Sequence, residues 1–345
     1  MKKILTAIFA LAATFALVSC GNKKNVVHIG YYTGDLCNAP MHIAMEKGFF
    51  EEEFKKAGVE FDYISRVQAN ANTGELIASG KMDAGTDLAA AILPSMENGL
   101  KITYVLGFHT GCTKFYVRQD SGINSVEDLK GKKVAIPGLQ DTAYMNLRRK
   151  LESVGIKTSQ EDGEVEFIVY DQTSIPIALD KGNVDVIGIH DPVATLVEKQ
   201  YGFKKIFDIG TDPDFEKEYC CQAFVSQKLV KENPEGAKAF ARALLKASAY
   251  VQEEPYETAK LQLEKNWTTG DAQENGEILS LLNYVPSIRG GKATVGKQAR
   301  DLQKLGILRE NTDIEKFIDE AFTVLPDVPD SYKYDKASGE FTPVY

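Results

Sequence analysis

The stretch VVHIGYYTGDLCNAPMHIAMEKGFFEEE, residues 26–53, decides the fold because it holds a strand, a polar loop and a helix in succession. Residues 26–32 are rich in β-branched and aromatic side chains, which is typical of a strand, and turn-forming residues follow at 33–38. Pro40 suits the first turn of a helix, and apolar side chains then recur at helical spacing. The stretch therefore predicts the opening β-α unit of an α/β fold.

The residues before this stretch are predicted to be a processing segment. A basic start and an apolar run lead into Leu17-Val18-Ser19-Cys20, which resembles a bacterial lipobox. We expect a signal peptide over 1–19, lipidation of Cys20 and a polar tether over 20–25. The protein would then be exported and lipid-anchored to the outer face of the bacterial cell membrane, in the periplasm or at the cell surface. An ordinary secretory signal is the alternative.

The composition is that of a globular protein. The chain has 345 residues, of which 43% are hydrophobic and 26% charged, so it is long enough for two domains. Loss of Lys2 and Lys3 with the signal peptide would change the formal net charge from −9 to −11. This negative charge argues against nucleic acid as a partner.

Two segments far apart in the chain, 80–87 and 182–191, repeat one pattern. In each, a helix ends at a glycine, an aspartate lies three residues later, a strand of small residues follows, and another aspartate stands near the strand's end. We interpret the repetition as two similar α/β lobes, although the order helix, glycine, strand is common enough to arise by chance.

Several motifs resemble one known family of binding proteins. They are the Ala39-Pro40 pair with Glu46-Lys47-Gly48-Phe49-Phe50-Glu51 after it, residues 76–87, the run Ser-x-x-Asp-Leu-Lys-Gly-Lys-Lys-Val-Ala from residue 125, and residues 224–235. They resemble the NMT1/THI5-like substrate-binding lipoproteins that serve ABC importers for nitrate, sulfonates and thiamine precursors. The same family contains a eukaryotic thiamine-pyrimidine synthase. The resemblance covers nearly all of the chain after the predicted signal peptide.

This resemblance implies a type II periplasmic-binding-protein fold, in which two α/β lobes are joined by a two-strand hinge. We expect the chain to cross between the lobes near Cys112–Thr113 and near Cys220–Cys221. The expected divisions are 26–112 with 222–325 for lobe 1, 113–221 for lobe 2, and 326–345 for a loose C-terminal tail. Closure of the lobes would capture a small molecule, which would pass to a permease and its ATPase. We expect a monomer without a cofactor.

Ligand-binding candidates follow from the rule that ligands bind beyond the carboxyl ends of strands in α/β sheets. The helix expected after Gly138 adds backbone N–H groups suited to a polar or anionic ligand group. The candidates are Tyr32, Asp35, Cys37, Asn38, Asp87, His109, Cys112, Gln140, Asp141, Thr142, His190 and Asp191.

The four aspartates among the candidates indicate the kind of ligand. Clustered carboxylates would repel nitrate or a sulfonate, whereas they accept hydrogen bonds from ring N–H or amino groups. Tyr31, Tyr32, Phe108 and Tyr144 could stack on a ring, although most of these aromatic residues are expected in the core. We therefore expect a small nitrogen heterocycle such as a thiamine-precursor pyrimidine. A nitrate, alkanesulfonate or taurine ligand is the alternative, and each aspartate could instead cap a turn.

Besides Cys20, the chain has four cysteines, each expected in a loop or hinge strand. They are Cys37, Cys112, Cys220 and Cys221. A disulfide such as Cys37 to Cys112, or one that involves Cys220 or Cys221, would suit an exported protein. Free buried thiols are a second interpretation. A soft-metal or metal-complex site aided by His109 or His190 is a third, although the spacing matches no zinc motif.

The sequence argues against an enzyme. The positions that align with the synthase's reactive lysine and histidine are Asp87 and Ala91, which cannot perform that chemistry. The chain also lacks a Gly-x-Ser-x-Gly elbow, a His-Glu-x-x-His motif and a phosphate-binding Gly-Lys-Ser/Thr loop. A purely structural lipoprotein would not need paired lobes with polar strand ends. We therefore expect a binding protein without catalytic residues.

Overall fold

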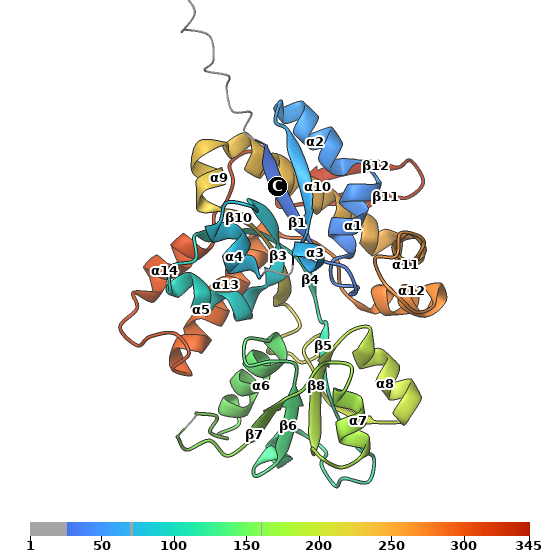
Figure 1. Ribbon diagram of the computed structural model, residues 1–345, viewed down its shortest axis with the longest axis vertical. Helices are drawn as coiled ribbons and strands as arrows, with labels where there is room; N and C mark the ends of the chain where they lie inside the picture. Colours follow the sequence, from blue (N-terminus) through green and yellow to red (C-terminus); the bar gives the residue numbers. More distant parts are fainter. Residues whose placement is uncertain (1–25, 70–71, 160) are drawn as a thin grey trace, which may run out of the picture.

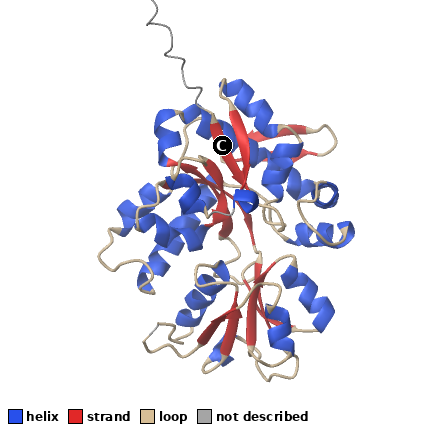
Figure 2. Ribbon diagram, viewed as in Figure 1, coloured by secondary structure: helices blue, strands red, loops and turns tan. Residues whose placement is uncertain are grey.

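A computed structural model of the chain describes residues 26–69, 72–159 and 161–345. Its strands form two five-stranded sheets and one hairpin in these ranges. Figure 1 shows two bodies joined by narrow connections, and Figure 2 shows helices flanking the strands of each. The prediction of a two-lobed α/β fold is confirmed. The predicted signal peptide, tether and Cys20 lie outside the described residues.

The first sheet, in the lobe we call lobe 1, has the order β2-β1-β3-β10-β4. β1 is parallel to both β2 and β3, while β10 runs antiparallel to β3 and β4. The strands are β1 (Val27–Tyr31), β2 (Phe61–Ser65), β3 (Ala84–Leu88), β4 (Ile102–Thr110) and β10 (Tyr219–Ser226). β10 lies between β3 and β4 in the sheet, although the whole of lobe 2 separates it from them in the sequence. The sheet of lobe 1 is therefore complete only with the strand that returns from lobe 2.

The second sheet, in lobe 2, repeats this arrangement in the order β7-β6-β8-β5-β9. β6 is parallel to β7 and β8, and β5 is antiparallel to β8 and β9. The strands are β5 (Thr113–Val117), β6 (Lys133–Ile136), β7 (Glu166–Val169), β8 (Val186–His190) and β9 (Lys204–Asp208). β3 and β8, the strands of the repeated sequence pattern, hold the same central place in their sheets.

Helices flank both sheets (Figure 2). Lobe 1 has α1 (Ala39–Glu46), α2 (Phe49–Ala57), α3 (Arg66–Ala69), α4 (Thr73–Ala78), α5 (Ala89–Glu97), α9 (Gln227–Glu232), α10 (Pro234–Glu253), α11 (Pro255–Glu264), α12 (Ala272–Leu281), α13 (Ile288–Lys304) and α14 (Ile314–Ala321). Lobe 2 has the 3-10 helix η1 (Val126–Leu129), α6 (Thr142–Ser153), α7 (Ile175–Asp180) and α8 (Val193–Tyr201). None of the described helices is long and apolar enough to cross a membrane.

The longest helix, α10, shows how the sequence builds the core of lobe 1. Asn233 accepts a hydrogen bond from the N–H of Gly236, and Pro234 follows it in the first turn. The buried face of α10 packs on α1 and α2, where the rings of Phe240 and Phe50 stack with centroids 5.8 Å apart. Burial of such large rings is the main stabilising contribution here.

The C-terminal residues differ from the predicted loose tail. Residues Ser331–Asp335 (β11) and Glu340–Val344 (β12) form an antiparallel hairpin that packs on α10. The Phe341 ring lies edge-on to Phe49 at 5.2 Å. The aromatic residues on the hairpin supply its apolar contacts. The prediction of a loose tail relied on the aspartates and prolines of this region and did not take these aromatic residues into account.

The chain passes between the lobes twice, from β4 to β5 and from β9 to β10, and the two passages touch. Gly111 has φ of +81°, which favours glycine. A Cβ placed on Gly210 would lie 3.0 Å from the Cα of Gly111, so the two backbones are in direct contact. The lobes also meet at α6 and α13, where Arg149 pairs with Asp301 at 2.7 Å. We expect the lobes to rotate about the two passages.

Substitution of Gly210 by alanine tests the close backbone contact. The added methyl group must push Gly111 away, and we expect the free energy of unfolding to fall by about 1–3 kcal/mol. The matched control is Gly138→Ala, because a Cβ there meets no atom closer than 4.0 Å. Urea denaturation measures both. Equal stability of Gly210→Ala and the wild type would contradict this account of the hinge.

Candidate functional site

The loop after β1 presents Asp35 beside Asn38 and Thr86. One Asp35 carboxylate oxygen accepts hydrogen bonds from the Asn38 backbone N–H at 2.7 Å and from its side-chain amide at 3.1 Å. The Asn38 amide oxygen in turn accepts a hydrogen bond from the Thr86 hydroxyl at 2.5 Å. Asp35 remains half-exposed, and it has no ion-pair partner within the described chain. The loop thus presents one fixed carboxylate without a neutralising cation.

Arg66 stacks on Tyr32, the residue that connects β1 to this loop. Its guanidinium sits 3.7 Å from the centroid of the Tyr32 ring and pairs with Asp87 at 3.1 Å. The Arg66 side chain is almost fully buried, and it also donates to the backbone oxygen of Thr86 at 2.9 Å. Asp87 accepts a further hydrogen bond from Thr73 at 2.5 Å. The positive charge of Arg66 is therefore engaged inside lobe 1.

Lobe 2 contributes a histidine–aspartate pair at the ends of its strands. His190, the last residue of β8, has Nε2 2.8 Å from Asp141 and Nδ1 3.0 Å from the Thr113 hydroxyl. Burial opposes protonation of His190, but the charge and hydrogen bond of Asp141, with a smaller contribution from Cys112, outweigh it and raise the pKa of the imidazole well above its usual value. Asp141 also caps α6 by accepting from Ala143 N–H at 2.7 Å. An anionic ligand would therefore meet a carboxylate at this helix end.

Asp191 is buried next to the histidine and precedes Pro192, the N-cap residue of α8. Helix α8 begins at Val193, after Pro192. The Asp191 carboxylate binds the Lys114 ammonium at 2.7 Å and accepts from the Thr195 backbone N–H at 3.0 Å. Burial raises the pKa of Asp191, while Lys114 opposes the shift. This pair lies inside lobe 2 and leaves Asp191 little surface for a ligand.

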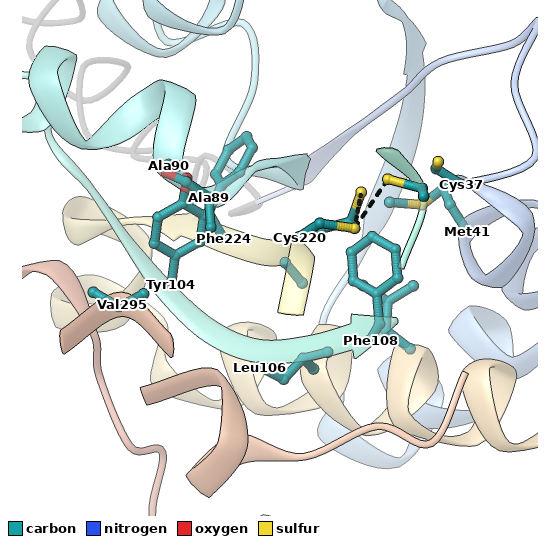
Figure 3. Close-up of a cluster of buried hydrophobic side chains, with 14 of the residues drawn as sticks. Cys37, Met41, Ala89, Ala90, Tyr104, Leu106, Phe108, Cys220, Phe224 and Val295 are labelled. Carbon is teal, nitrogen blue, oxygen red and sulfur yellow. Dashed lines mark hydrogen bonds between the residues drawn. The ribbon is translucent and has the colours of Figure 1, made fainter. Parts of the chain in front are cut away.

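The four remaining cysteines gather where the two passages meet lobe 1, and all are free and buried. The sulfur atoms of Cys112 and Cys220 are 3.0 Å apart, and Cys220 lies 3.8 Å from the Cys221 sulfur. Figure 3 shows sulfur atoms collected beside Phe108, between Cys220 and Cys37. Hydrogen bonds from Cys220, Cys221 and Cys37 lower the pKa of Cys112, whereas burial raises the pKa of Cys220 and Cys221. The structure does not pair Cys37 with Cys112 in a disulfide.

The other predicted positions divide between surface and core. Gln140 is exposed, whereas Thr142 at the start of α6 is buried and its hydroxyl has no hydrogen-bond partner. Phe108 and Tyr144 are core residues, so neither can stack on a ligand as the structure stands. Tyr32 remains half-exposed. A surface hollow near Val26 lies at the amino end of β1 and is separate from the candidate site.

The NMT1/THI5-like family model matches residues 37–258, which is more than half of the chain. The chain belongs to the NMT1/THI5-like family. The matched residues include the loop after β1 from Cys37 onward, both passages between the lobes and the whole of lobe 2.

Individual relatives of this NMT1/THI5-like protein are named as binding proteins. A putative aliphatic sulfonates-binding protein of Bacillus subtilis is 25% identical, covering 76% of this chain and 77% of the relative. The riboflavin-binding protein RibY of Chloroflexus aurantiacus is also 25% identical, over 68% of this chain and 64% of that protein. The crystal structure of the periplasmic aliphatic sulphonate binding protein SsuA from Escherichia coli superposes with a TM-score of 0.67 at 18% identity, covering 86% of this chain and 92% of that one. The chain thus has the periplasmic-binding-protein fold of this solved structure.

Two cations near the site were not among the sequence candidates. Arg66 directly follows β2, so the strand-end rule that selected Asp35 and Asp87 could have found it. Lys114 sits within an otherwise buried strand and is a partner for Asp191. A lysine inside an apolar run could have indicated a buried ion pair, because burial of an unpaired charge is costly.

The His190–Asp141 pair predicts a pH dependence of stability. Because its folded pKa is raised, protonated His190 stabilises the fold below its unfolded pKa of about 6.5, and this contribution is lost as the pH rises through the folded pKa. In Asp141→Asn the cap is retained but the charge is absent. We expect the variant's unfolding free energy to lose this slope and its His190 pKa to fall.

Urea denaturation across the pH range and NMR titration of the imidazole measure the two effects. The same His190 pKa in the wild type and in Asp141→Asn would show that Asp141 does not control the imidazole.

Proposed function

We propose that this protein is an extracytoplasmic, lipid-anchored solute-binding component of an ABC importer, and that its cargo is a small nitrogen heterocycle of the thiamine-precursor pyrimidine type. One observation carries the choice of cargo. An acidic partner is present for each of the three cations near the candidate residues, namely Arg66, Lys114 and His190. Asp35, in contrast, has no ion-pair partner within the described chain. A ligand that donates hydrogen bonds fits this charge arrangement.

The charges at the site support a neutral or cationic ligand over an anion. Arg66 pairs with Asp87, and Lys114 pairs with Asp191. A sulfonate or nitrate would have to draw one of these buried cations from its carboxylate and would leave that carboxylate uncompensated. An amino or ring N–H group needs no such rearrangement, because the half-exposed Asp35 oxygen atoms can accept its hydrogen bonds.

The aromatic and amide groups next to Asp35 support a planar ligand. Tyr32 is half-exposed and directly precedes the loop, so a heterocycle bound to Asp35 would lie within reach of its ring. Asn38 and Thr86 form a fixed polar pair behind the carboxylate. The carboxylate is thus oriented before the ligand arrives, which lowers the entropy cost of binding.

Lobe 2 would complete the site on closure. His190 ends β8 and is fixed by Asp141 and Thr113, so rotation about the two passages would bring an oriented imidazole toward the ligand held by lobe 1. The closed protein would then be recognised by the permease and its ATPase. The proposed lipid on Cys20 would keep a monomeric carrier near the membrane.

A sulfonate is the second candidate, and two observations favour it. The relatives from Bacillus subtilis and Escherichia coli are named for aliphatic sulfonates. The Thr142 hydroxyl at the start of α6 is also buried without a partner. Against this candidate, the Asp141 carboxylate already occupies that helix end. The relative from Chloroflexus aurantiacus is named for riboflavin, which is a nitrogen heterocycle, and this name supports a heterocyclic cargo.

Calorimetric titration of the full-length protein in detergent tests the cargo. We expect an aminopyrimidine thiamine precursor to bind, and taurine and short alkanesulfonates to bind much more weakly. Asp35→Asn should weaken pyrimidine binding about 10-fold or more, because a hydrogen bond to a charged acceptor contributes roughly 1.5–3 kcal/mol.

The matched control is Asp62→Asn, which removes one carboxylate from the exposed side of β2. This variant should bind like the wild type. Tighter binding of the sulfonates than of the pyrimidine would instead identify the second candidate.

A further inference from the structure

We propose that Cys37, His109, Cys112 and Cys221 form a tetrahedral site for a soft divalent metal ion of the Zn²⁺ class, resident at the hinge. The four residues each offer one ligand atom, and these atoms all lie within 4.8 Å of one another. The site is independent of the small-molecule cargo proposed above, because none of its ligand atoms is needed to hold a heterocycle at Asp35.

The spacing of the ligand atoms suits one metal ion. Zinc–sulfur bonds are about 2.3 Å long, which places two tetrahedral sulfur ligands about 3.8 Å apart. Atoms already within 4.8 Å of one another need only small side-chain movements to reach this geometry. The strand pairing supports the set, because Cys221 and His109 are register partners on β10 and β4 and so can present their side chains together.

Burial distinguishes this group from a set of surface residues. His109 and Cys112 are fully buried, and Cys221 is 4% exposed. The Nε2 atom of His109 is buried and has no hydrogen-bond partner. A buried imidazole nitrogen without a partner is costly to a folded protein, and a bound metal would let the ring use both nitrogens, one on the metal and one in a hydrogen bond.

The donor types select the kind of ion. Three cysteine sulfurs and one imidazole nitrogen are soft or borderline ligands that favour tetrahedral Zn²⁺, whereas Ca²⁺ and Mg²⁺ require oxygen ligands. Cys37 is the most exposed of the four at 9%, and it lies in the loop after β1, so it is the natural point of entry. Binding releases the thiol protons to solvent and therefore tightens as the pH rises.

The positions of the ligands give the ion a structural role. His109 lies near the end of β4, and Cys112 lies in the first passage between the lobes. Cys221 is the third residue of β10, the strand that returns to lobe 1, and Cys37 lies in the loop after β1 that carries Asp35. One ion would therefore connect the first passage and the strand that follows the second passage to the loop that carries Asp35. We expect metal binding to stabilise the hinge and to reduce the mobility of this loop. The ion would then be a structural part of the protein and not its transported ligand.

Titration of the reduced, metal-free, full-length protein tests the site. Zn²⁺ competed against a chromophoric chelator should bind at one ion per chain, whereas Ca²⁺ and Mg²⁺ should not bind. Co²⁺ in its place should give the intense thiolate-to-metal charge-transfer absorption and the visible bands of a tetrahedral centre. Failure of Zn²⁺ to bind the wild type, or a Co²⁺ spectrum without thiolate absorption, would overturn the proposal.

Three variants separate the ligands from their neighbours. Cys37→Ser and Cys221→Ser should weaken Zn²⁺ binding by at least about 100-fold, since the loss of outer partners alone changes affinity by about 10- to 100-fold. Cys220→Ser is the matched control, because this buried thiol touches Cys112 and Cys221 but is not one of the four ligands. As an outer partner, it should lose less Zn²⁺ affinity than either ligand variant, and an equal loss in this variant would show that the ligand set is wrong.

Two further measurements test whether the cysteines are oxidised and whether the metal site is independent of Asp35. Alkylation and mass analysis of the freshly purified, unreduced protein should find the thiols free, and a Cys112–Cys220 disulfide would overturn the resident-metal site. Asp35→Asn should bind Zn²⁺ like the wild type. Loss of heterocycle binding with intact Zn²⁺ binding, or the reverse, then shows which of the two proposals has failed.

Discussion

The contact of two backbones at Gly111 and Gly210 is the constraint on which the two-lobed architecture depends. Each passage leaves an edge strand of one sheet and enters the fourth position of the other, so β4 leads to β5 and β9 leads to β10. Both sheets are therefore completed by a strand that arrives from the opposite lobe. The passages can run side by side only because neither carries a side chain at their closest approach.

The two passages also determine where the polar residues lie, because both pass between the strand ends of the two sheets. Strands that end near the passages bring charged side chains together, and the fold neutralises most of them internally, as with Arg66 and Asp87 or Lys114 and Asp191. Pairing offsets part of the desolvation cost of these buried charges and also makes them less available to bind a ligand. What remains is a half-exposed carboxylate at Asp35 on one side and the fixed imidazole of His190 on the other.

The sequence predicted the strands and helices more completely than it predicted the contacts of the site residues. Strand and helix positions followed from local apolar periodicity, and the strand-end rule selected Asp35, Asp141 and His190 at the polar ends of the strands. The same rule could not show that Asp191 is buried against Lys114, because a hydrogen-bond partner from another strand leaves no local trace. The hairpin at the C-terminus was missed for a related reason, since its apolar contacts are with a helix distant in the chain.

The sequence by itself determined the α/β class, the repeated lobe pattern and the family. The first two follow from local apolar periodicity, and the family follows from short motifs such as the Lys47-Gly48-Phe49-Phe50 block. Only the tertiary structure decided which charges are neutralised and that four cysteines from three separate segments meet in one buried group. The reason is physical: periodicity reflects which face of an element is buried, whereas ion pairs and ligand sets depend on distances between elements that the chain brings together only when both passages are in place.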